Sequence, residues 1–106
     1  MRVLLDECVP QRFSRLIVGH AVRTVPQEGW SGKKNGELLA LVISAGFDVF
    51  VTVDQNIRYQ QNLRAAGMAV VVMCGPTNQL ADLEPLAPAV LTALATLQPG
   101  EVVEVR

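Results

Sequence analysis

The stretch DVFVTVD, residues 48–54, is the strongest indicator of the fold class of this chain. Its continuous apolar run is typical of a strand covered on both faces, as in parallel sheets, and the run ends in the carboxylate Asp54. The opening stretch MRVLLDECVP, residues 1–10, has the same pattern, because its apolar run stops at Asp6 and Glu7. Packing does not explain acids at the ends of buried strands, so these acids are candidate functional residues.

Strands and helices alternate along the rest of the chain. Hydrophobic periodicity and turn residues predict strands over 2–5, 20–25, 48–54, 68–73 and 101–106, and helices over 10–19, 36–46, 57–67 and 83–97. This alternation predicts a three-layer α/β/α domain with a mainly parallel five-stranded sheet and right-handed crossovers. In the common strand order 2-1-3-4-5, the first and third strands are neighbours, so their terminal acids converge at the carboxyl edge of the sheet.

Length and composition limit the possible functions. The 106 residues, 50% of them hydrophobic, fit one domain over 1–106. No signal-peptide pattern or membrane-length apolar run is present, so we expect a cytoplasmic protein with no membrane partner. The net charge of −1 argues against nucleic-acid binding by bulk charge alone, but a local basic patch stays open. Cys8 and Cys74 are too few for a zinc site, and this strand order separates them by roughly 10 Å, too far for a disulfide.

Acids occur at three places that this topology brings to one edge. They are Asp6 with Glu7, Glu37 in the first turn of the second helix, and Asp54 after the third strand. Carboxylates that lie close together repel one another unless a cation compensates, and oxygen ligands suit Mg²⁺ or Mn²⁺. An ion held by Asp6, Glu37 and Asp54 can activate water against a phosphodiester bond. The simpler alternative is that each acid caps a turn or a helix start.

Three segments resemble a known family. LLDECVP, GWSGKKNGELLAL and VFVTVDQN are similar to the short PIN-like proteins of unknown function, which are relatives of the PIN-domain ribonucleases. The resemblance covers nearly the whole chain. It implies Asp6 as the first metal ligand, Glu37 as the helix acid and Asp54 as the acid that closes the third strand. Asn56 falls where many relatives have a fourth acid, and Asn35 falls where short PIN-like proteins often have Asp.

The resemblance also implies a function. PIN relatives act as metal-dependent toxin ribonucleases in bacterial toxin–antitoxin modules, so it implies an RNA substrate, an antitoxin partner and a Mg²⁺ or Mn²⁺ cofactor. PIN relatives commonly dimerise, which makes a homodimer our expectation. An amide can hold a metal-bound water but adds no charge, so Asn35 and Asn56 leave a second alternative open. In that alternative the chain is a catalytically degenerate PIN-like binding module.

Basic residues are expected beside the acids. Arg12, Lys33, Lys34 and Arg58 lie near the same edge in this topology and are candidate phosphate contacts, although surface cations are ordinarily just solvated. Trp30 lies in a glycine-flanked loop, where it could stack on a base or close a small core.

A third alternative is a phospho-accepting receiver domain. Receiver domains use an acid pair after the first strand, an aspartate after the third strand and a lysine after the fifth. Both lysines of this chain, Lys33 and Lys34, precede the third strand, and no lysine follows the fifth. The missing lysine makes this alternative the weakest of the three.

Overall fold

The computed structural model describes residues 1–33, 35–56 and 65–106, without the side chain of Asn35. Five strands of the described chain form one sheet in the order β2-β1-β3-β4-β5, and every neighbouring pair is parallel. The predicted strand order is therefore confirmed, and each strand forms within its predicted bounds. The strands are β1 (Arg2–Leu5), β2 (Ala21–Thr24), β3 (Val49–Thr52), β4 (Ala69–Met73) and β5 (Val102–Val105).

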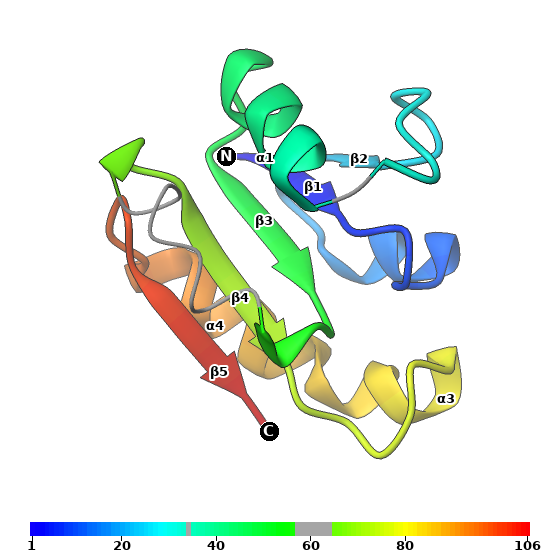
Figure 1. Ribbon diagram of the computed structural model, residues 1–106. Coiled ribbons are helices and arrows are strands. Elements are labelled where there is room, and N and C mark those ends of the chain that lie inside the picture. The colour runs from blue at the N-terminus through cyan, green and yellow to red at the C-terminus, as the bar shows by residue number, and fades with distance from the viewer. Residues whose placement is uncertain (34, 57–64) are drawn as a thin grey trace.

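Helical segments cover both faces of the sheet, which gives three layers (Figure 1). Helix α1 lies on one face, while η1 and α4 lie on the other, with α3 and η3 leading into α4. No described helix has the length and apolar character that crossing a membrane requires. The bounds are η1 (Gln11–Leu16), α1 (Asn35–Ser44), α3 (Leu80–Leu83), η3 (Glu84–Leu86) and α4 (Ala87–Thr96).

Alternate residues of the central strands pack into two separate core clusters. Leu5 and Val51 join Phe13 in the cluster on the α4 side, while Leu4 and Phe50 belong to the cluster under α1. All five side chains are completely buried. A shift of one residue in register would exchange the two faces of a strand, so this burial fixes which residue follows each strand at the carboxyl edge.

The first helix differs from the prediction. An α-helix was expected over 10–19, but the structure has a 3-10 helix, η1, limited to Gln11–Leu16. The amide of Phe13 bonds the carbonyl of Pro10 at 3.0 Å, three residues back, which is the tighter pattern. Apolar residues three apart, such as Phe13 and Leu16, fit either helix type, so periodicity could not separate the two.

The last helix is also divided, where one helix over 83–97 was expected. The chain forms α3 up to Leu83, then the 3-10 turn η3, and only then α4. Pro85 and Pro88 have no amide hydrogen, so the i to i−4 ladder fails in two successive turns. The helix predicted over 57–67 lies mainly outside the described residues.

Candidate metal centre

The candidate site is built where β1 and β3 end side by side. These two strands pair in parallel, with Leu5 opposite Val51. The amide of Asp6 continues the ladder by donating to the carbonyl of Val51 at 2.9 Å. Asp6 is half-buried, and its backbone is held by the sheet rather than by a loop. The position of its carboxylate is therefore set by strand pairing.

The hydroxyl of Thr52 joins the two strand ends. Its Oγ1 donates to Oδ2 of Asp6 at 2.7 Å and accepts the amide hydrogen of Asp54 at 3.0 Å. Thr52 is completely buried, whereas Asp6 and Asp54 are half-buried. One buried side chain thus orients the first carboxylate and fixes the backbone that carries the second.

The turn after β3 is organised by Asp54 itself. Oδ1 of Asp54 accepts the amide hydrogen of Asn56 at 3.0 Å, an arrangement that Asp favours in turns. Asn56 is exposed, and its backbone serves this turn. The second carboxylate oxygen of Asp54 has no partner within the described chain and is free to bind a ligand.

The turn after β1 ties a second loop to the site. Oδ1 of Asp6 accepts the amide hydrogen of Glu7 at 2.8 Å, and Oε1 of Glu7 accepts the amide hydrogen of Gly32 at 3.1 Å. Trp30, from the same loop, packs edge-on against the ring of Phe47, with 6.2 Å between ring centroids. The loop is therefore held through Gly32 and through Trp30. Trp30 packs against the core cluster under α1.

Cys8 adds a thiol beside the first carboxylate. Its Sγ donates to Oδ2 of Asp6 at 3.5 Å and lies 3.8 Å from Oγ1 of Thr52. Burial raises the pKa of the Cys8 thiol, and the charge of Asp6 raises it further, so the group stays protonated at neutral pH. Asn78, after β4, donates its amide to the carbonyl of Cys8 at 3.1 Å and braces this turn. Cys8 and Cys74 are both free thiols, as predicted.

The carboxylate of Glu37 is already paired with a lysine. It is exposed in the first turn of α1 and forms an ion pair with Lys33 at 3.0 Å. Lys33, a predicted phosphate contact, therefore neutralises Glu37 in this conformation. Arg12 is exposed on η1. The predicted contacts Lys34 and Arg58 lie outside the described residues.

Asp6 and Asp54 suit a metal ion that needs only one or two ligands from the protein. Among the described residues, no group of three or more His, Cys, Asp or Glu side chains could hold a metal ion. The predicted set of Asp6, Glu37 and Asp54 does not form such a group. Mg²⁺ is nevertheless commonly bound through one or two carboxylates, with waters and substrate phosphates as the other ligands. Asp6 and Asp54 fit that smaller requirement, because both supply hard oxygen ligands at adjacent strand ends.

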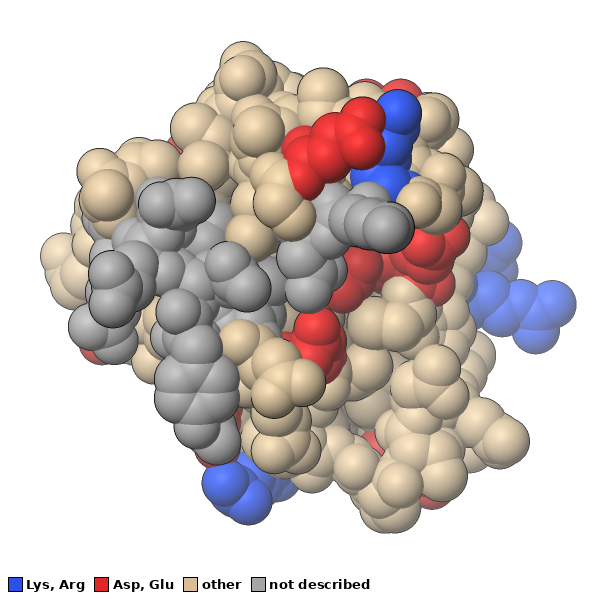
Figure 2. Space-filling view, in the orientation of Figure 1, with Lys and Arg blue, Asp and Glu red and all other residues tan. Residues whose placement is uncertain are grey.

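Charge at this edge is unbalanced. Neither Asp6 nor Asp54 has an ion-pair partner in the part of the chain that the structure describes. Figure 2 shows several acidic side chains close together near the centre of the visible face, with a basic side chain beside the uppermost one. Asp6 and Asp54 therefore lack a compensating charge among the described residues.

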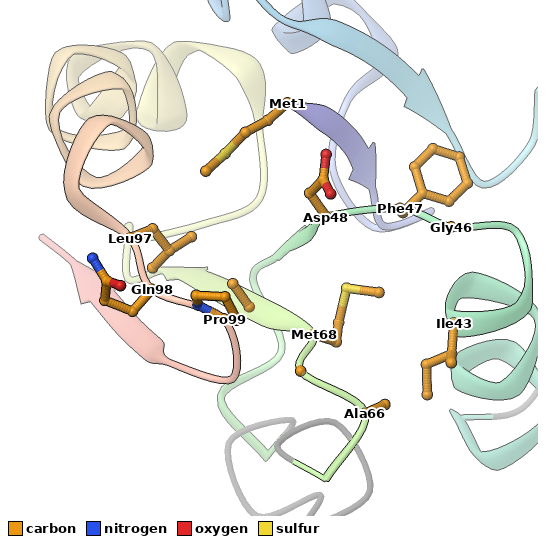
Figure 3. Close-up of a pocket in the computed structure, with 12 residues that line it drawn as sticks. Met1, Ile43, Gly46, Phe47, Asp48, Ala66, Met68, Leu97, Gln98 and Pro99 are labelled. Carbon is orange, nitrogen blue, oxygen red and sulfur yellow. The ribbon is translucent and has the colours of Figure 1, made fainter.

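A cavity lies elsewhere, at the amino ends of β3 and β4 (Figure 3). Its volume is about 630 Å³. Its lining includes the apolar side chains of Ile43, Met68 and Leu97, with Asp48 as the one carboxylate. In open α/β sheets ligands gather at the carboxyl ends of strands, so this cavity is not part of the acid site.

Sequence reasoning missed two residues that organise the site. Neither Thr52 nor Asn78 is among the residues that the sequence predicts for the site. A polar residue inside an otherwise apolar run, two places before Asp54, is a signal that could have identified Thr52, because residues i and i+2 share one face of a strand. Nothing local marks Asn78, whose partner Cys8 is 70 residues away in sequence.

No protein-family model, curated protein or solved structure matches this chain. The resemblance to PIN-like proteins therefore stays a prediction, carried by the three sequence segments and by the position of the acids.

Proposed function

We propose that this protein is a PIN-like metal-dependent nuclease that hydrolyses RNA. The observation that supports this most is the hydroxyl of Thr52, which bonds the Asp6 carboxylate and the Asp54 amide at once. This hydrogen bond orients the Asp6 carboxylate and holds the backbone that carries Asp54, so it supports the proposal that the two acids act together.

Asp6 and Asp54 would hold Mg²⁺ or Mn²⁺, with substrate phosphate oxygens as further ligands. The ion, when bound, lowers the pKa of its water and stabilises the charge that develops on the phosphodiester. Thr52 keeps one oxygen of Asp6 fixed through its hydrogen bond, so the carboxylate is oriented before the ligand arrives. The backbone amide of Asn56 holds the turn in which Asp54 lies. In this proposal the side-chain amide of Asn56 would orient a water that the ion binds.

Glu37 enters the site in this proposal by exchanging partners. Its ion pair with Lys33 is exposed, and such pairs are worth at most about 1 kcal/mol. Glu37 would have to leave that weak pair to become a ligand, and Lys33 would then be available to an RNA phosphate, as the sequence predicts for it.

A toxin role belongs to the same proposal. Toxin ribonucleases of the PIN type need an antitoxin protein, and they commonly form homodimers. The resemblance of the three sequence segments supports such a partner and such an assembly for this chain. No surface described above is assigned to the antitoxin or to the dimer contact.

The test is a calorimetric titration of Mn²⁺ into the wild-type protein, Asp6→Asn and Asp54→Asn, followed by incubation with a pool of RNAs and Mn²⁺. We expect saturable binding and cleavage by the wild type, and neither in the two variants. RNA cleavage that survives both substitutions would contradict the assignment of the site. Cleavage that survives chelation by EDTA would contradict metal dependence.

A degenerate PIN-like binding module is the second candidate. Two observations favour it: Glu37 is neutralised by Lys33, and Asn56 supplies an amide where relatives have an acid. A folded wild type that binds no Mn²⁺, even with RNA present to complete the ligands, would support this candidate over the nuclease.

A further inference from the structure

Two arginines on η1 differ from the other described basic residues. Arg12 and Arg15 are exposed and make no hydrogen bond or ion pair in the described chain. Every other arginine or lysine side chain that the structure describes is engaged. The pairs are Arg2 with Ala45, Arg23 with Glu28, Lys33 with Glu37 and Arg106 with Glu104.

The 3-10 geometry of η1 aligns the two guanidinium groups. In a 3-10 helix the side chains at positions i and i+3 eclipse one another, so Arg12 and Arg15 lie on the same side of η1. Phe13 is completely buried in the core on the α4 side, which fixes the rotation of η1. Two like charges are thus held next to each other on a short and anchored segment. An α-helix over the same residues would have offset them.

A hollow lies between these side chains. Its volume is about 260 Å³, and Gln11, Arg12, Ser14 and Arg15 line it. The hydroxyl of Ser14 donates to the carbonyl of Gln11 at 2.7 Å, so it is turned toward the helix backbone. No carboxylate lines the hollow, and its charged groups are two guanidinium donors. It has room for a phosphate group with several waters, each of which occupies about 30 Å³ in the liquid.

The hollow lies close to the candidate metal centre along the chain. Arg12 is six residues after Asp6, which limits their Cα separation to on the order of 20 Å. The chain turns within this segment, since the amide of Val9 bonds the carbonyl of Asp6 at 3.0 Å, so the true separation is shorter. In Figure 1, η1 is the blue helical segment that follows the end of β1. An extended strand of a few nucleotides would reach from one site to the other.

We propose that Arg12 and Arg15 form a phosphate clamp for single-stranded RNA, a few nucleotides away from Asp6 and Asp54. The planar guanidinium forks suit the oxygens of a phosphodiester, and neither has an internal partner to give up. The identity of the strand as RNA rests on the proposed function, whereas the clamp rests on the geometry of η1. Inorganic phosphate has the same chemistry as one link of the strand, and the test separates the two sources.

The test measures binding without chemistry. A fluorescein-labelled oligouridylate of about ten nucleotides, within the range of single-strand site sizes, is titrated in EDTA and followed by fluorescence anisotropy. The proteins are the wild type, the double variant Arg12→Gln/Arg15→Gln and the control Arg23→Gln, which removes an exposed arginine on β2. Circular dichroism verifies that all three fold, which we expect because every changed side chain is exposed.

We expect the double variant to bind the RNA about tenfold more weakly at about 50 mM salt, because fewer phosphates are neutralised. The slope of log affinity against log salt should fall by about 0.7 for one lost phosphate and about 1.4 for two. Arg23→Gln should match the wild type. Inorganic phosphate should displace the RNA only in large excess, because it offers one phosphate where the strand offers several.

Three outcomes would overturn the clamp: no RNA binding by the wild type, unchanged binding by the double variant, or an equal loss in Arg23→Gln. Displacement by inorganic phosphate mole for mole would overturn RNA as the occupant. Binding that depends on the arginines, with no metal-dependent cleavage by the wild type, would leave the clamp and refute the nuclease. Cleavage that requires Asp54 but not the arginines would support the nuclease and refute the clamp.

Discussion

Asp48 precedes β3 and Asp54 follows it, and the two aspartates have different neighbours. At the amino end, Oδ2 of Asp48 accepts the amide hydrogen of Arg2 at 2.7 Å. The guanidinium of Arg2 lies 4.7 Å from the centre of the Phe47 ring and bonds the carbonyl of Ala45 at the end of α1. At the carboxyl end, Asp54 shares its surroundings with a second acid and has no cation in the described chain.

This contrast is one reason why we propose a functional role for Asp54 and a structural role for Asp48. The amino end has a cavity of about 630 Å³ with Asp48 in its lining (Figure 3), and the Asp48 carboxylate accepts a backbone amide hydrogen there. The carboxyl end has two acids and no ion-pair partner for either among the described residues. Because ligands of open α/β sheets gather at the switch point, we place the proposed site there rather than at the cavity.

Asp54→Asn and Asp48→Asn should show the largest difference of all the variants, in how far Mn²⁺ raises Tm. Mn²⁺ at 100 times its dissociation constant should stabilise the wild type by about 2.7 kcal/mol, which raises Tm by roughly 10–20 °C for a domain of this size. Asp54→Asn should lose this rise, and Asp48→Asn should keep it. Differential scanning fluorimetry with and without Mn²⁺ measures both. If Asp48→Asn lost the rise as well, the difference between the two ends would not be functional.

Thr52→Val tests whether the buried hydroxyl organises the acids. It leaves the Asp6 carboxylate and the Asp54 amide without their shared partner, which should cost about 2 kcal/mol of unfolding free energy. Mn²⁺ affinity should fall about 10- to 100-fold, as for other groups that orient a metal ligand. Urea unfolding and calorimetry are the measurements.

Thr24→Val is the matched control for Thr52→Val, because Thr24 is also buried at the end of a strand. Its hydroxyl accepts the amide hydrogen of Gln27 at 3.2 Å and does not touch the acids. We expect a similar loss of stability with unchanged Mn²⁺ affinity. Equal loss of affinity in both variants would mean that Thr52 acts only through overall stability.

Arg2→Met should have a smaller effect, confined to the amino end. The substitution keeps an apolar stem and removes the guanidinium from Phe47 and from the carbonyls of Ala45 and Gly46. We expect a loss of about 1 kcal/mol in urea unfolding, because the guanidinium is exposed and partly solvated. The rise of Tm with Mn²⁺ should not change. A weaker metal response in Arg2→Met would show that the two ends are coupled.

The same contrast explains what the sequence could predict. Strand positions follow from buried apolar runs such as 48–54, and the strand order is the common one for strands that alternate with helices. The acids at the ends of β1 and β3 follow from that order. Side-chain partners do not, because the Lys33–Glu37 pair and the bond from Asn78 to Cys8 depend on loop geometry. Helix type at η1 also escaped prediction, since apolar residues three apart fit both types.

The smallest predicted effect concerns Glu37, the acid that the structure pairs with a lysine. Lys33→Gln should change the unfolding free energy by only about 0.3 kcal/mol, because the pair is exposed to solvent and Lys33 lies before the start of α1. The same variant should bind Mn²⁺ a few-fold more tightly, because Glu37 no longer has to leave a cation to reach the metal. Calorimetry on Lys33→Gln and Glu37→Gln distinguishes the alternatives. If neither variant changes Mn²⁺ affinity, Glu37 belongs to the surface of α1, and the metal centre consists of Asp6 and Asp54 alone.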